Sequence, residues 1–215
     1  EERTRLGTLL DGQVRRLVER FGGGIEDEPF PARVGVFLLG SRDRFALVEA
    51  QQFDCYAGEQ CAVQLHVDGS IFLITADTTA VRGVLDHQMS RAVARAWLLG
   101  LHAPCPLPVW LEQGFMTAAA WAETPPGAGY GRREAIESVR SGRSLDALLE
   151  FDDTWSADPL DEGRAGLLVE RLLAQPEALH ACLLSIKSGS AWRESFEEAY
   201  GATPGDLADY AARWY

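Results

Sequence analysis

The chain changes character once, near Thr79, and this change limits the possible folds more than any other feature of the sequence. Before Thr79, short apolar or alternating runs predict strands. These strands are expected over 32–39, 62–67 and 70–75. Asp68-Gly69, between the last two strands, is typical of a two-residue hairpin turn. After Thr79, amphipathic segments separated by Gly and Pro predict helices. The fold class is therefore α+β, with a small N-terminal sheet unit followed by a mainly helical half.

Capping residues and glycines mark the expected ends of the helices. Apolar residues at helical spacing predict a helix over residues 1–20, which Gly22-Gly23-Gly24 then ends. Ser41 can cap a helix that reaches Ala50. In the second half, helices are expected over 81–100, 109–122, 132–140, 144–150, 160–174, 177–188, 191–199 and 204–214. Thr203-Pro204 starts the last helix with a hydroxyl cap and a proline in the first turn. The Pro- and Gly-rich stretch over 124–131 is the most obvious loop.

Charge argues against a nucleic-acid partner, and hydropathy argues against a membrane-spanning segment. The chain has 32 acidic and 20 basic residues, a formal net charge of -12, which would repel the phosphate backbone of a nucleic acid. No run approaches the roughly 20 consecutive apolar residues of a membrane-spanning helix. The high Ala, Arg and Gly content suggests a GC-rich bacterial source. We expect a single folded domain over 1–215, with subdomains 1–78 and 79–215.

The cysteines and the N-terminus bear on the cellular compartment. Cys55 and Cys61 bracket a segment that could turn and bring their side chains together, whereas Cys105 and Cys182 are expected to be small buried hydrophobes. No pair has the CxxC spacing of a thiolate metal site. The chain begins at Glu1 without an initiator Met or a leader, which leaves open a processed export signal or a trimmed sequence before it. A periplasmic or otherwise exported location is favoured, with the cytoplasm as the alternative.

The segment from Val84 to Arg91 carries the strongest functional signal. It places His87 and Arg91 four residues apart, on one face of the helix expected over 81–100. HExxH zinc peptidases use this spacing for two zinc-binding imidazoles, and the glutamate between them activates the metal-bound water. In this chain Gln88 stands at the glutamate position and Arg91 at the second imidazole position.

A second segment, Leu107 to Gly114, follows after a loop and reads Leu-Pro-Val-Trp-Leu-Glu-Gln-Gly. Together the two segments resemble the peptidase MA-like superfamily of gluzincin-type (thermolysin-like) HExxH zinc metallopeptidases. In those families a Leu-Pro-x-Trp-Leu-x-Glu-Gly segment follows the HExxH helix, and its Glu supplies the third zinc ligand. Alignment on Trp110 and Gly114 puts Gln113, and not Glu112, at that ligand position. The resemblance implies a gluzincin-like fold for the chain from about residue 30 onward.

The departures from the family pattern remove its chemistry. A zinc site needs about three ligands that are neutral imidazole, thiolate or carboxylate, and of the expected set only His87 remains. Arg91 stays protonated and repels a divalent cation, and Gln88 cannot take a proton from water. A rough alignment puts Glu162 where many gluzincins carry a Tyr or His that stabilises the tetrahedral intermediate. Because Gln88, Arg91 and Gln113 depart together, we interpret the site as naturally degenerate.

We therefore predict a pseudo-peptidase that is not an enzyme, holds no metal or other cofactor, and acts by binding or scaffolding a protein or peptide partner. One alternative is a metallopeptidase with a rebuilt, non-standard metal site. A weaker alternative is a different hydrolase that has reused the cleft. The other histidines, such as His66 and His180, are interpreted as structural.

Two hypotheses concern what the degenerate cleft does. In the first, amide and guanidinium donors converge there and bind a carboxylate or a peptide. The residues of this possible binding cleft are His87, Gln88, Arg91 and Gln113. In the second, Arg91 replaces the metal as a cross-link between helices by pairing with an acidic side chain. The candidate partners of Arg91 are Asp86, Glu112 and Glu162.

Overall fold

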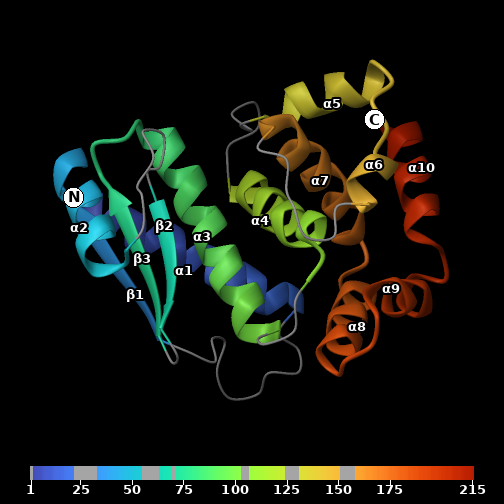
Figure 1. Ribbon diagram of the computed structural model, residues 1–215, viewed down its shortest axis with the longest axis horizontal. Coiled ribbons are helices and arrows are strands. Elements are labelled where there is room, and N and C mark those ends of the chain that lie inside the picture. The colour runs from blue at the N-terminus through green and yellow to red at the C-terminus, as the bar shows by residue number, and fades with distance from the viewer. Residues whose placement is uncertain are drawn as a thin grey trace. The chain divides into compact units, whose positions relative to one another are not determined.

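The computed structural model describes residues 2–21, 33–54, 63–68, 71–102, 107–123, 131–150 and 158–215. The chain divides into two compact units, Glu1–Gly100 and Leu101–Tyr215. The described part contains helices and a small sheet, so the predicted α+β class is confirmed (Figure 1). The predicted subdomain boundary at 78/79 lies inside the first unit, and the single domain over 1–215 stays a prediction.

The first unit combines one sheet with three described helices. In chain order its elements are α1 (Glu2–Phe21), β1 (Arg33–Leu39), α2 (Arg42–Gln52), β2 (Val63–Asp68), β3 (Ile71–Asp77) and α3 (Arg82–His102). The strand order is β1-β3-β2, with β1 parallel to β3 and β2 antiparallel to it. All six elements lie within a few residues of their predicted positions. The parallel pairing of β1 with β3 is a feature that the sequence pattern does not predict.

The strand register separates two sets of side chains onto opposite faces of the sheet. Val36 on β1 and Leu65 on β2 both pair with Ile74 on β3, which is fully buried. The opposite face carries His66 and Thr75, whose side chains contact α2. Figure 1 shows α2 and α3 on opposite sides of the three strands, so helices cover both faces.

Two polar contacts join α3 to α1 within the first unit. One guanidinium nitrogen of Arg5 donates to both carboxylate oxygens of Asp86, at 2.5 and 2.6 Å. The buried side-chain amide of Gln13 donates to the backbone oxygen of Ser90 at 2.6 Å. These contacts, made two turns apart on α1, help to set which face of α3 is buried.

All the described secondary-structure elements of the second unit are helices. Its elements are α4 (Val109–Glu123), α5 (Arg132–Arg140), α6 (Asp146–Leu149), α7 (Pro159–Leu172), α8 (Pro176–Lys187), α9 (Trp192–Tyr200) and α10 (Pro204–Trp214). Glycines let α4 approach α7 closely. A Cβ atom on Gly114 would lie 2.5 Å from the backbone oxygen of Ala165, and one on Gly166 would lie 2.8 Å from the methyl carbon of Thr117. Only glycine fits these two positions without separating the helices.

The predicted helix starts are confirmed where a side chain caps the helix. The Ser41 hydroxyl accepts from the backbone N–H of Arg44 at 3.1 Å. Thr203 and Asp206 form a reciprocal capping box at the start of α10. In contrast, α6 is shorter than the predicted 144–150, because the Ser144 hydroxyl accepts from the backbone N–H of Asp146 in a turn before the helix.

Several predicted features lie wholly or partly outside the described residues. They are the three glycines Gly22 to Gly24, the turn residue Gly69, the loop over 124–130, and Cys55, Cys61 and Cys105. Cys182 is described, and it is a free, buried cysteine as predicted. None of the helices in the described ranges has the length and apolar character to cross a membrane.

Candidate functional site

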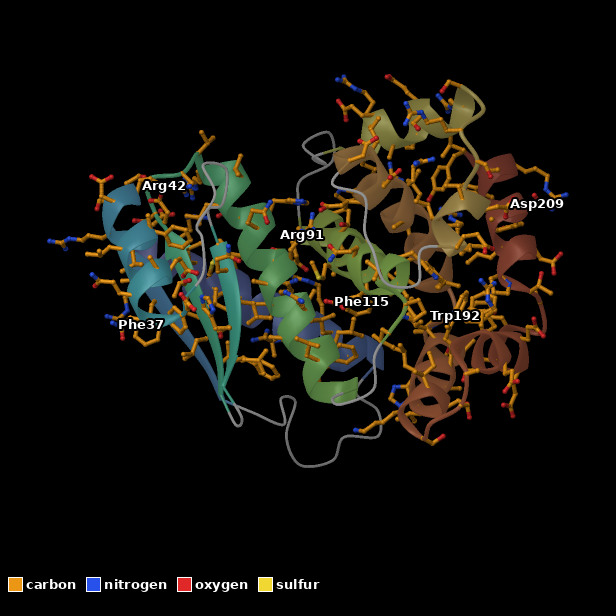
Figure 2. The ribbon with its side chains drawn as sticks, viewed as in Figure 1. Phe37, Arg42, Arg91, Phe115, Trp192 and Asp209 are labelled. Carbon is orange, nitrogen blue, oxygen red and sulfur yellow. The ribbon has the colours of Figure 1, made fainter. Side chains whose placement is uncertain are left out.

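Helix α3 is buried along most of its surface but keeps a line of partly exposed side chains. The buried side includes Leu85, Met89 and Trp97. Five of the partly exposed residues repeat every three or four positions, which places them along one side of the helix. This α3 line consists of Val84, Gln88, Arg91, Arg95 and Leu99. Its centre therefore presents one amide and two guanidinium groups between apolar ends, and Figure 2 shows Arg91 projecting from α3.

His87 lies beside the α3 line, on the buried side, with only 7% of its surface exposed. Burial, and secondly the positive charge of Arg91, lower the pKa of His87 to about 4. Both effects disfavour the protonated imidazole, since a cation loses hydration on burial and is repelled by a neighbouring cation. His87 is therefore a neutral imidazole at pH 7.

The donor set at this segment does not fit a zinc ion. His87 supplies one imidazole, and the residue one turn further along the helix is Arg91, which has no lone pair to donate. Within the described ranges, no three His, Cys, Asp or Glu side chains are grouped so that they could hold a metal ion. The absence of a metal from the function stays a prediction.

One of the three acidic residues predicted to pair with Arg91 is bound by a different arginine in the structure. The Asp86 carboxylate is engaged by Arg5, which donates to both of its oxygens. Asp86 therefore serves to join α1 to α3. Pairing of Arg91 with Glu112 or Glu162 stays a prediction.

Gln113 lies in the first turns of α4, in the second unit. Gln113 and its neighbour Glu112 are partly exposed, whereas Trp110 and Gly114 on either side of the pair are buried. The Trp110 ring packs edge-on against Trp192 of α9, with ring centroids 5.8 Å apart. Trp110 and Gly114, the two residues that set the alignment with the gluzincin pattern, thus have packing roles that fix the position of Gln113 on its unit.

Glu162 lies in the first turn of α7, which begins at Pro159 after the capping residue Asp158. Glu162 is partly exposed, whereas its neighbour Asp161 is buried and forms an ion pair with the buried guanidinium of Arg164. Arg164 also donates to the backbone oxygen of Ser144 at 3.0 Å. Asp161 therefore has a structural role, whereas the Glu162 side chain has access to solvent.

The structure brings together part of the predicted site. His87, Gln88 and Arg91 lie on one helix of the first unit, and Gln88 and Arg91 share the α3 line. Gln113 and Glu162 lie on α4 and α7, which pack against each other in the second unit. The convergence of these two groups into one cleft stays a prediction.

Sequence reasoning missed Arg95 and a buried polar cluster. Arg95 lies four residues after Arg91 and therefore on the same helix face as Gln88 and Arg91. This spacing can be found in the sequence alone. In the buried cluster, the Glu49 carboxylate accepts from the Thr75 hydroxyl and lies 3.0 Å from Nε2 of His66. The Phe53 ring stacks on the His66 ring, with centroids 3.6 Å apart. Because one nitrogen of His66 faces both Glu49 and Thr75, the cluster lacks the relay through two imidazole nitrogens that a catalytic triad uses.

Comparison of the chain with protein-family models, curated proteins and solved structures yields no match. The gluzincin-like relationship therefore stays a prediction, which rests on the residues of the two segments around His87 and Trp110.

Proposed function

We propose that this chain is a catalytically inactive, zinc-peptidase-like domain that binds a protein or peptide partner through the α3 line. The observation that carries the proposal is the chemistry of that line. Gln88, Arg91 and Arg95 present hydrogen-bond donors along one partly exposed helix face, and the adjoining His87 is neutral. A carboxylate is the group on a peptide that such donors bind most strongly.

The residues that would perform hydrolysis are replaced by residues that favour binding. Peptide hydrolysis by an HExxH enzyme needs a metal ion and a general base. Gln88 has no basic group at neutral pH, and Arg91 brings positive charge to a position where a zinc ligand would be needed. Both side chains instead donate hydrogen bonds, and Gln88 also accepts them.

Because the chain carries a net negative charge, two arginines on one helix face stand out as a site for a carboxylate more than they would on a neutral protein. At -12, the surface as a whole repels anions, so a carboxylate gains affinity where positive charge is concentrated. Val84 and Leu99 end the line with apolar surface, against which the side chains of a peptide could pack.

The proposal is tested by selecting peptides from a display library on wild-type protein and measuring their affinity by calorimetry. Arg91→Gln should weaken the selected peptides by about ten- to a hundredfold, because it removes a charge-assisted hydrogen bond. The matched control is Arg44→Gln, an exposed arginine on α2 of the same unit, which should leave affinity unchanged.

Three results would contradict the proposal. They are a selection that yields no binders, binders that do not distinguish Arg91→Gln from Arg44→Gln, and cleavage of the selected peptides in the presence of zinc, detected by mass spectrometry. The last result would favour the metallopeptidase with a rebuilt metal site.

A further inference from the structure

A groove on the first unit lies between α1 and β1 and has a volume of about 690 Å³. One wall is formed by α1, including Leu10 and Val14, and the other by β1, including Val36 and Leu38. Val93 of α3 also lines it. The groove uses none of the residues of the α3 line, so it is a separate feature of this unit.

The β1 wall of the groove exposes more apolar surface than a strand of a closed core would. Val36 is 38% exposed and Phe37 is 54% exposed, although they point to opposite faces of the sheet. Among the described strands, β1 pairs only with β3, so one of its edges has no described neighbour. Apolar side chains grouped at such an edge are typical of a surface that another chain covers.

Helix α1 carries a charged row along the groove. Arg3, Gly7 and Asp11 follow one another at intervals of four residues, and all three line the groove. Arg3 and Asp11 are exposed, and they stand at equal distances on either side of Gly7. The row therefore has opposite charges at its two ends and a residue without a side chain at its centre.

Packing among the described residues of this unit gives no reason for a glycine at position 7. Apart from the two chain neighbours of Gly7 and the α1 backbone around it, no described atom lies within 4 Å of where a Cβ on Gly7 would be. A glycine inside a helix costs about 0.5–1 kcal/mol relative to alanine. A gap of this kind on an exposed helix face allows the backbone of another helix to approach closely.

We propose that the groove is an interface with a second copy of this chain, whose α1 crosses the first α1 in the antiparallel direction at Gly7. A two-fold axis at Gly7 brings Arg3 of one copy to the partner subunit's Asp11, and Asp11 to the partner subunit's Arg3. An interface related by a two-fold axis must be complementary to itself, and this row meets that requirement because its charges are opposite and equally spaced.

The helix geometry is compatible with this arrangement. Four residues rise about 6 Å along a helix, so both ion pairs lie within reach of an arginine side chain from the crossing point. Residues spaced by four form one of the ridges along which helices pack, and two such ridges cross at about 50°. Each α1 then covers part of the apolar groove of the other copy, including Leu10 and Val36.

The test measures mass by sedimentation and light scattering from about 1 µM to about 300 µM, a range suited to small transient interfaces. Wild type should form a dimer that dissociates on dilution and weakens in high salt. Arg3→Asp and Asp11→Arg should each weaken association by about tenfold or more, because like charges then meet at both ends of the row. The two variants mixed in equal amounts should form a heterodimer of wild-type affinity, because opposite charges meet again.

A substitution at Gly7, the crossing point, tests the close approach of the two helices independently of their charges. Gly7→Leu should abolish the dimer while raising the thermal stability of the monomer, since leucine favours a helix and its side chain has open space. A wild type that stays monomeric at every concentration would overturn the proposal. So would a dimer that is insensitive to Arg3→Asp and Asp11→Arg, a mixture of these two variants that remains monomeric, or a dimer that survives Gly7→Leu.

Discussion

Protonation of His87 should destabilise the fold, and the resulting loss in the free energy of unfolding can be worked out from the structure. The pKa of His87 is about 4 in the folded chain, against about 6.5 for an ordinary histidine. One pKa unit corresponds to about 1.4 kcal/mol, so the full effect is about 3 kcal/mol. That is a large share of the roughly 5–15 kcal/mol by which domains are stable.

The direction of the effect follows from which state binds more protons. Between pH 6.5 and pH 4 the unfolded chain has His87 protonated while the folded chain keeps it neutral. Stability therefore rises with pH across this window, is fully present above about pH 6.5, and is lost as the pH falls toward 4. Between pH 7 and pH 5 the loss due to His87 alone is about 2 kcal/mol.

The measurement is urea unfolding at a series of pH values for wild type and for His87→Gln, which does not titrate. Other groups contribute equally to both proteins, so the difference between their free energies of unfolding should change by about 2 kcal/mol from pH 7 to pH 5. NMR of the four histidines, with the His87 signals identified by their absence from the variant, should show no titration of His87 above about pH 5. A His87 that titrates near pH 6.5, or a free-energy difference that is independent of pH, would refute the burial and charge argument.

Two further substitutions test the packing of each unit. Gly114→Ala places a Cβ 2.5 Å from a backbone oxygen of α7 and should lower the free energy of unfolding by about 1–3 kcal/mol, whereas Gly40→Ala, which meets no described atom within 4 Å, should change it by less than about 0.5 kcal/mol. Glu49→Ala removes the buried partner of His66 and should cost about 3 kcal/mol, against less than about 0.5 kcal/mol for the exposed Gln51→Ala on the same helix. Urea unfolding at pH 7 checks both pairs, and equal losses in variant and control would contradict the packing described.

The sequence predicts most helices and strands well because their ends are marked locally. Ser41 and Thr203 each stand directly before a helix and cap it by accepting from a backbone N–H three residues further on. Helix α5 has the predicted bounds between Gly131 and Ser141. The antiparallel pairing of β2 with β3 also agrees with the predicted hairpin. Helix caps and hairpin turns depend on residues close together in the sequence, so they can be recognised in a single sequence.

The features that sequence reasoning missed depend on contacts between distant segments. The pairing of β1 with β3 joins Val36 to Ile74, and nothing local to either strand specifies it. The Glu49–His66 contact is likewise long-range, although Glu49 follows the buried Phe45 by one helical turn and so lies on the inner face of α2. For the candidate site, the sequence placed His87 and Arg91 one turn apart on one helix, whereas the lowered pKa of His87 depends on its burial, which the sequence does not show.

The most direct test of the account is the zinc content of the protein. Elemental analysis would compare wild type with His87→Ala after both are purified without metal-affinity resin, incubated with zinc and passed through a desalting column. If the site around His87 is degenerate, neither protein should retain zinc above the level of a chelator-treated control. About one zinc per chain in wild type, lost in His87→Ala, would contradict it and show that a metal site has been rebuilt around this histidine.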